Sequence, residues 1–287
     1  MKKTKAFTLI ELLVVVAIIA LLISILLPSL SRARELSKRT VCGANVRGVG
    51  QAFYIYAQDD PGTFPAIAST TTSPEGGFQV FNSTDRSIEP STTGCPSPTV
   101  DMWAIVRANN TTPKQYICPS TSDVQDPAQD TTVYYDFNSA TNLSYAYQYQ
   151  HDPNRRVIGT SSEPTFPVLG DANPYIKGGL VIGADLVKDR TGAGRGNSFN
   201  HTGREGQTVL YQDGHATFEK GPDCGLSGDV GTTPAALKKI SRGRDNIYTV
   251  HERNKQVDAG SVAPTLTGAG CTGLCNLGDQ SDTCLIP

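Results

Sequence analysis

The chain has 287 residues, enough for one ordinary domain with elaborations or for two small ones. Hydrophobic residues make up 38%, but many of them lie near the N-terminus, so the remainder is lean and rich in Gly, Pro, Ser, Thr, Asn and Asp, as exported domains are. The formal charge is −2, and the one basic run is short and comprises Arg32, Arg34, Lys38 and Arg39. Nucleic-acid binders usually carry a basic surplus or stripe, so no nucleic-acid partner is expected.

Residues 9–27 predict a membrane-spanning helix. They are apolar except for Glu11 and Ser24, and their 19 positions approach the ~20 residues that cross a bilayer. Lysines precede the segment, and flanking basic residues prefer the cytoplasm. We therefore expect a single pass through the inner membrane, with a cytoplasmic N-terminus and an extracytoplasmic remainder. A cleaved secretory signal fits less well, because its apolar region is only roughly 7–15 residues long and ends at a small-x-small site.

Glu11 is the residue that a plain membrane anchor does not explain. A carboxylate in the apolar layer costs about 2.5–3.5 kcal/mol on insertion scales. Cleavage between Ala6 and Phe7 would create an α-amine one helical turn before Glu11. In a helical assembly, the amine of one subunit and the carboxylate of its neighbour would neutralise each other and specify the register.

The stretch KKTKAFTLIELL, residues 2–13, resembles the type IV prepilin motif that pilins share with the pseudopilins of type II secretion. The resemblance implies cleavage and N-methylation before Phe7 by a prepilin peptidase, and a filament role for Phe7 and Glu11. The family usually has Gly before the cut, whereas this chain has Ala6, which is also small.

Beyond Pro28, which should kink the helix, residues 29–58 predict an amphipathic continuation. An apolar stripe at steps of four and three predicts packing on a sheet, and a second face of small residues suits a neighbouring helix. Three glycines, Gly43, Gly48 and Gly50, predict either local fraying or tertiary contacts that hold them helical. The stripe comprises Cys42, Val46, Val49, Phe53 and Tyr56, and the small face comprises Ala33, Ser37, Val41, Ala44, Gly48 and Ala52.

The predicted fold is α+β and pilin-like, with the long N-terminal helix packed on an antiparallel β-sheet. A short helix is expected at residues 103–107, and strands are expected at 132–135, 143–149, 167–170 and 207–212. The domain plan is a leader at 1–6, a transmembrane and polymerisation helix at 7–28, the amphipathic helix at 29–58, a β-rich globular domain at 59–254 with an irregular insert at 68–100, and a Cys/Gly-rich tail at 255–287.

The stretch from Phe199 to Phe218 predicts a hairpin whose two-residue turn is Asp213-Gly214, with positive φ at both positions. It also resembles the His…Asp-Gly carboxyl-terminal motif of a large group of bacterial prepilin-like proteins. Segments at 41–50, 116–120, 170–174 and 245–249 resemble further parts of the same group.

Histidines and carboxylates near this hairpin suggest a metal site. The alternative is that the aspartate only forms the turn and that the histidines lie at the surface and form hydrogen bonds with the loop. Ca²⁺ is favoured, as the resemblance to major pseudopilins implies, over a transition ion. A hydrolase built on Ser198 lacks a Gly-x-Ser-x-Gly elbow, and no enzymatic activity is expected. The candidate ligands are His201, Asp213 and His215, which Asp171 and Asp245 could join.

Seven cysteines in a chain with a membrane-targeting N-terminus predict disulfides rather than a metal cluster, with at least one cysteine left over. Cys42 with Cys118 is the first expected pair, and Cys95 with Cys118 is the alternative. The tail lacks a Cys-x₂-Cys pair, so a disulfide is favoured there over zinc. The candidates are Cys42, Cys95, Cys118, Cys224, Cys271, Cys275 and Cys284.

Together these patterns predict a structural subunit of a type IV pilus-like filament or a type II secretion pseudopilus. Its expected partners are the membrane, a prepilin peptidase and further pilin-like subunits, including copies of itself, and the assembled form would lie at the cell surface. The alternative is an exported surface protein that uses the helix only as an anchor and binds a ligand through the 68–100 insert.

Overall fold

The structure is a computed structural model that describes residues 9–60, 62–66, 86–87, 98–148, 150, 158–174, 176–177, 180–181, 196–222, 224–225, 247–248, 250–251, 261–262 and 285–286. Several predicted site residues lie outside these ranges, so their predictions stay as they are. They are Ala6, Phe7, Asp245, Cys95, Cys271, Cys275 and Cys284.

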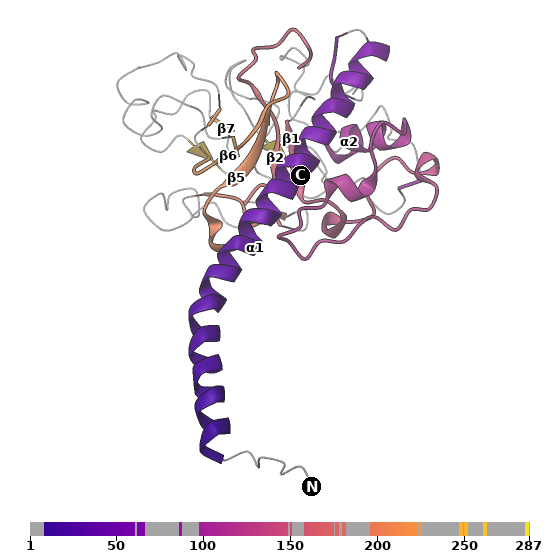
Figure 1. Cartoon of the computed structure of the whole chain (residues 1–287). Helices are drawn as coiled ribbons and strands as arrows, with labels where there is room; N and C mark the ends of the chain where they lie inside the picture. Colours follow the sequence, from indigo (N-terminus) through magenta and orange to yellow (C-terminus); the bar gives the residue numbers. More distant parts are fainter. Residues whose placement is uncertain are drawn as a thin grey trace, which may run out of the picture.

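One helix, α1 (Leu9–Asp59), runs without interruption from the apolar segment into the globular part. Its 51 residues correspond to roughly 77 Å at ~1.5 Å per residue. Pro28 lies inside the helix, and the hydroxyls of Ser24 and Ser29 donate to the carbonyls of Leu21 and Leu26 at 2.8 and 2.9 Å. Proline and such back-bonding both bend helices, and Figure 1 shows α1 curving between its free and its packed halves.

The main sheet is antiparallel, in the order β6-β5-β2-β1-β9. Its strands are β1 (Tyr145–Gln148), β2 (Pro167–Asp171), β5 (Gln207–Tyr211), β6 (Ala216–Glu219) and β9 (Leu285–Ile286). Two small ribbons pair β3 (Ile176–Lys177) with β4 (Leu180–Val181), and β7 (Val250–His251) with β8 (Ser261–Val262). The predicted α+β fold with a long helix on an antiparallel sheet is confirmed.

Short helices cover the side of α1 away from β6 (Figure 1). They are α2 (Pro98–Arg107), which confirms the helix expected there, and the 3₁₀ turns η1 (Pro113–Tyr116), η2 (Thr131–Val133) and η3 (Ala140–Asn142). A further 3₁₀ turn, η5 (Thr202–Arg204), lies on the side of β5 and β6 (Figure 1). The strand predicted at 132–135 is wrong. The Asp130 carboxylate caps the Thr132 N–H at 2.9 Å, and the Tyr134 carbonyl accepts from the Trp103 indole at 2.8 Å, so this stretch turns instead of pairing.

The outer half of α1 packs on one face of the sheet. The predicted stripe is buried at four positions and half-buried at Tyr56, which packs against the same core. The other face of the central strands is covered by a second apolar cluster that includes Ile247 and Tyr248. Strands β1, β2 and β5 are therefore buried along their whole length.

Gly50 allows the closest approach between α1 and the sheet. A Cβ at this position would lie 2.8 and 2.9 Å from the two methyl carbons of Leu210, which is itself buried in β5. Gly43 lies on the same helix but would place its Cβ against only the Arg47 side chain at 3.7 Å. All three helix glycines are held helical, so the tertiary-contact alternative is the one that the structure supports.

We expect Gly50→Ala and Gly43→Ala to change stability in opposite directions. Gly50→Ala overpacks the interface and should lower the free energy of unfolding by about 1–3 kcal/mol. Gly43→Ala should raise it by about 0.5–1 kcal/mol, because alanine loses less backbone entropy in a helix. Urea unfolding of the full-length chain in detergent measures both, and equal effects would contradict this packing.

The β5–β6 hairpin is confirmed, but its predicted turn is wrong. Gly214 has φ +87°, whereas Asp213 does not have a positive φ. The Gly214 N–H donates to the Tyr211 carbonyl at 2.9 Å, and the Tyr211 N–H donates to the His215 carbonyl at 2.9 Å. This is a three-residue connection closed by a left-handed glycine, because the extra residue Gln212 enters the turn.

Candidate functional site

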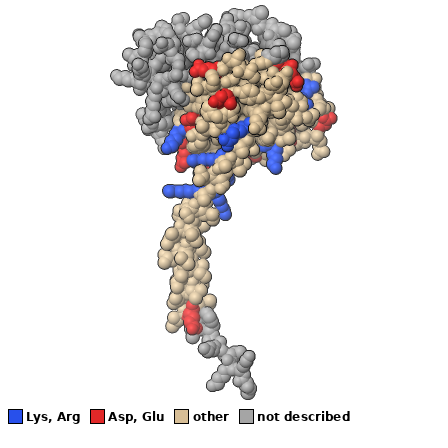
Figure 2. Space-filling model, turned by 45° about the horizontal axis from the view of Figure 1, so that its top comes forward, with Lys and Arg blue, Asp and Glu red and all other residues tan. Residues whose placement is uncertain are grey.

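The free half of α1 presents an apolar surface with no protein against it. Every Leu, Ile and Val from Leu9 to Leu30 is between 46% and 78% exposed. Figure 2 shows this half as an uncharged rod with acidic atoms only near its end. By length and composition, α1 is the helix among the described residues that could cross a membrane. An uncovered apolar surface of this kind needs lipid or other helices around it.

Glu11 lies in the first turn of α1 and is exposed. It is the only acidic residue between Leu9 and Arg34. Its position within an otherwise aliphatic surface is the one that the sequence predicts for a charge used in assembly.

Basic side chains collect where the rod meets the globular part (Figure 2). Arg32, Arg34 and Lys38 are exposed there. Arg39 instead binds the domain: its guanidinium lies 2.6 Å from the Glu205 carboxylate and 4.4 Å from the ring centroid of Phe218. Three residues of the basic run therefore lie exposed beside the apolar segment, and the fourth, Arg39, contacts the domain.

The predicted small-sided face is divided by the structure. Ala33, Ser37, Val41 and Ala44 are exposed and could accept a neighbouring helix. The remainder faces the domain, because Gly48 approaches the Gln115 side chain and Ala52 is buried.

A buried polar cluster lies where α1 meets the sheet. It contains Cys42 of α1, Cys118 just after η1, Asp171 at the end of β2 and His201 just before η5. One donor atom from each residue lies within 4.8 Å of every other, and all four residues are buried. The Asn45 side-chain amide donates to the Ile117 carbonyl at 3.0 Å, which fixes the backbone that carries Cys118 against α1.

The Asp171 carboxylate is the centre of this cluster. One oxygen, Oδ2, accepts from the Thr208 backbone N–H at 2.6 Å, and Oδ1 accepts from Asn200 Nδ2 at 2.9 Å. The Cys42 thiol lies 3.5 Å from Oδ1, and its sulfur is 3.4 Å from the Tyr145 hydroxyl. These bonds offset much of the cost of burying a carboxylate.

His201 joins the cluster to α1. Its Nδ1 lies 3.0 Å from Oε1 of Glu35, which also accepts from the Ser120 hydroxyl at 3.1 Å. Its Nε2 lies 3.2 Å from Asp171 Oδ2 but without hydrogen-bond geometry, so this buried nitrogen has no hydrogen-bond partner among the described residues.

The electrostatics of the cluster are strongly coupled. Burial would lower the pKa of His201, yet the Asp171 carboxylate and the Cys42 thiol raise it to about 10. The Cys118 sulfur, burial and the Asp171 charge together raise the pKa of Cys42 far above its usual range. Burial would raise the pKa of Glu35, but contacts with His201 and Ser120 lower it overall.

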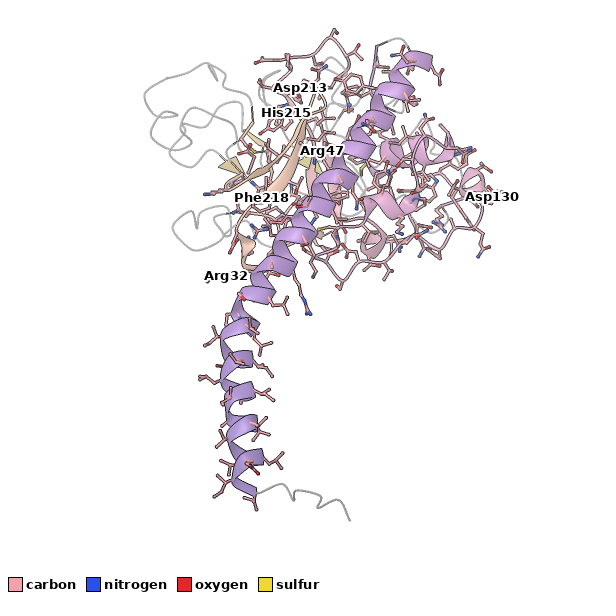
Figure 3. The ribbon with its side chains drawn as sticks, in the orientation of Figure 1. Arg32, Arg47, Asp130, Asp213, His215 and Phe218 are labelled. Carbon is pink, nitrogen blue, oxygen red and sulfur yellow. The ribbon has the colours of Figure 1, made fainter. Side chains whose placement is uncertain are left out.

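The structure divides the predicted metal ligands into two places. Asp171 and His201 are together in the cluster, whereas Asp213 and His215 contact each other in the exposed turn after β5. Thr208, which binds Asp171, and Asp213 are five residues apart along this strand and turn, or roughly 17 Å at ~3.4 Å per residue. Figure 3 shows Asp213 and His215 at the opposite end of the hairpin from Phe218, whose ring centroid is 5.3 Å from that of His201.

The donors around Asp171 are not those that Ca²⁺ prefers, whereas Asp245 lies outside the described residues and the Ca²⁺ site as a whole stays a prediction. Calcium takes six to eight oxygen ligands, whereas Asp171 is surrounded by two thiols and an imidazole. A hydrolase triad does not form either: Ser198 donates to the Ala172 carbonyl at 2.8 Å, and Asp213 contacts His215 rather than His201.

The structure describes three of the predicted disulfide cysteines, Cys42, Cys118 and Cys224. Cys42 and Cys118 lie side by side, as the expected pairing requires, but both are free thiols in the structure. Cys224 is also buried, with its sulfur 3.7 Å from the Pro222 carbonyl oxygen. The sequence predicted Asp171 and His201 as candidate metal ligands and Cys42 with Cys118 as a disulfide pair, but it did not predict that all four residues lie together.

We expect Asp171→Asn to destabilise the domain far more than Asp213→Asn. An amide at Asp171 turns a donor toward the Thr208 N–H or the Asn200 amide, which costs about 2–3 kcal/mol in the interior. Asp213 is 44% exposed, and an asparagine in this turn still accepts the His215 N–H, so its effect should stay within about 0.5 kcal/mol. Urea unfolding compares the two variants; similar midpoints would show that Asp171 is not the central acceptor.

Comparison with known proteins adds one match. Residues 1–27 fit the family model described as the prokaryotic N-terminal methylation motif. The N-terminal segment of the chain is therefore type IV pilin-like. Residues 9–27 of the matched segment form most of the exposed apolar half of α1, and the α+β architecture agrees with the match. No curated protein and no solved structure matches the chain.

Proposed function

We propose that the chain is a structural subunit of a type IV pilus-like filament or a type II secretion pseudopilus, assembled through its N-terminal helix. The observation that carries this proposal is the methylation motif at residues 1–27 joined to an uncovered aliphatic helix with one acid, Glu11, in its first turn. Before assembly, the same apolar surface suits the inner membrane, with Arg32, Arg34 and Lys38 at the boundary between membrane and water.

Assembly would begin with processing of the leader. Cleavage between Ala6 and Phe7 and methylation of the new amine leave a cation at the end of the apolar rod. Within a bundle of such rods, this cation and the Glu11 carboxylate of an adjacent copy neutralise each other in a medium of low dielectric. Each charge is costly alone, so the pair favours one stagger between subunits over the others. The exposed small residues on the outer half of α1 allow the helices to approach closely.

Glu11→Val tests the charge pair, with Ser24→Val as the matched control. Both substitutions remove a polar group from the apolar segment, but the Ser24 hydroxyl is already satisfied by the Leu21 carbonyl of its own helix. We expect Glu11→Val to insert in the membrane normally and to reduce fibres in sheared-cell material at least about tenfold, equivalent to ~1.4 kcal/mol. Ser24→Val should assemble like the parent chain.

Normal fibres from Glu11→Val would show that the acid does not direct assembly. A chain that stays in the membrane without forming fibres in any variant would favour the anchored surface protein instead.

N-terminal sequencing and mass spectrometry of the purified chain test the processing step. We expect the mature protein to begin at a methylated Phe7. Ala6→Gly should increase the processed fraction, because glycine places the least bulk before the scissile bond. A purified chain that retains Met1 in cells with an active prepilin peptidase would argue against this proposal.

A further inference from the structure

The buried cluster has the donor set of a transition-metal site. Two thiols, one imidazole nitrogen and one carboxylate oxygen come from four separate segments and converge within 4.8 Å of one another. Cysteine sulfur, histidine nitrogen and aspartate oxygen are each ligands that Zn²⁺ takes in four-coordinate sites.

Two separations in this cluster have the size of the edges of a zinc tetrahedron. Bonds of about 2.3 Å to sulfur and about 2.0–2.2 Å to nitrogen and oxygen separate sulfur from oxygen by roughly 3.6 Å and nitrogen from oxygen by roughly 3.4 Å. The structure has 3.5 Å between Cys42 Sγ and Asp171 Oδ1, and 3.2 Å between His201 Nε2 and Asp171 Oδ2. The thiol and the imidazole therefore face the two oxygens of the same carboxylate, either of which can serve as the single oxygen ligand. The imidazole nitrogen that faces the others is also the one for which the described part of the chain supplies no hydrogen-bond partner.

We propose that Cys42, Cys118, Asp171 and His201 bind a structural Zn²⁺ ion that fastens α1 to the globular domain. The four protein ligands complete a tetrahedral shell, and all four residues are buried, so no position is left for a substrate or a reactive water. The role is therefore structural and independent of whether the chain polymerises.

The surroundings of the cluster support metal ligation. Glu35 accepts at His201 Nδ1, which orients the ring and leaves Nε2 for the metal, the arrangement typical of histidine ligands. The Thr208 N–H and the Asn200 amide hold the Asp171 carboxylate, and the Tyr145 hydroxyl lies beside the Cys42 sulfur. Two thiolates and one carboxylate around Zn²⁺ leave one net negative charge, which these three donors stabilise.

A disulfide between Cys42 and Cys118 is the competing chemistry. It would consume both thiols and leave Asp171 and His201 buried beside an uncharged bridge. The metal instead uses all four residues, and it accounts for the inward-facing Nε2, which the disulfide does not. Since the two states exclude each other, one experiment separates them.

The test uses the full-length chain, purified in detergent without chelators and then supplied with one equivalent of Zn²⁺. We expect about one zinc per chain by elemental mass spectrometry and unbonded Cys42 and Cys118 thiols by peptide mapping. Cys42→Ser should weaken zinc binding more than about 100-fold, beyond the range of second-shell changes. Cys224→Ser is the matched control, because Cys224 is buried but lies outside the cluster, and it should bind zinc like the parent chain.

Cobalt(II) gives a readout that does not depend on a variant folding. In the parent chain, Co²⁺ should produce the absorption of a tetrahedral site and thiolate-to-metal charge-transfer bands. A spectrum without thiolate ligation would overturn the proposal, as would a Cys42–Cys118 disulfide in the metal-loaded preparation, zinc retained in full by Cys42→Ser, or no bound zinc after reconstitution.

Glu35 is a positioning residue in this scheme, and Glu35→Gln tests it. We expect zinc affinity, measured by competition with a chelator, to fall about 10–100-fold while the tetrahedral Co²⁺ spectrum is kept. Glu205→Gln is the control, because Glu205 is 65% exposed and its ion pair among the described residues is with Arg39, not with one of the four proposed ligands. An unchanged affinity in Glu35→Gln would remove Glu35 from the site.

Discussion

The packing of the outer half of α1 on one face of the sheet is the contact on which the rest of the structure depends. Among the described residues the strands are short and turns and 3₁₀ helices are frequent, so α1 is the longest element that contributes side chains to the core. Gly50 lets it approach Leu210, and Phe53 packs its ring against Tyr147 and Phe64 at centroid distances of 5.0 and 5.7 Å. The same helix is bare along its first half, and one element therefore serves two environments.

Periodic signals made most of this fold predictable from the sequence. The stripe on α1, the helix around Trp103 and strands β1, β2 and β5 are local patterns, and the structure contains all of them. The failures are at places where a side chain competes with backbone pairing. Asp130 caps a 3₁₀ turn in a Tyr-rich segment that resembles a strand, and Gln212 widens a turn whose Asp-Gly pair predicts a tighter one. Strand β9 has two residues in a Gly-rich tail, which is too short for any period.

The candidate sites also differ in how far they depend on residues that are distant in the sequence. The exposed position of Glu11 within an aliphatic segment was predictable, because it depends only on residues that are close to Glu11 in the sequence. The cluster around Asp171 was not, because its four members are separated by at least 30 positions and meet only when α1, β2 and two loops pack together. Sequence proximity also misled: Asp213 and His215 lie near His201 in the chain, but strand β5 carries them to the far end of the hairpin.

The course of α1 also decides how mechanical load enters the domain. A force applied to the assembled helices would reach the domain through the free half of α1. Among the described residues, the first hydrogen bonds from the helix to the domain are those of Glu35 and Arg39, followed by the contacts of Cys42. Figure 1 shows the helix lying across the sheet rather than ending on it. A pull along the helix axis therefore shears many contacts at once, whereas a sideways pull peels them one after another. The domain should resist tension best in the direction in which its own helix points.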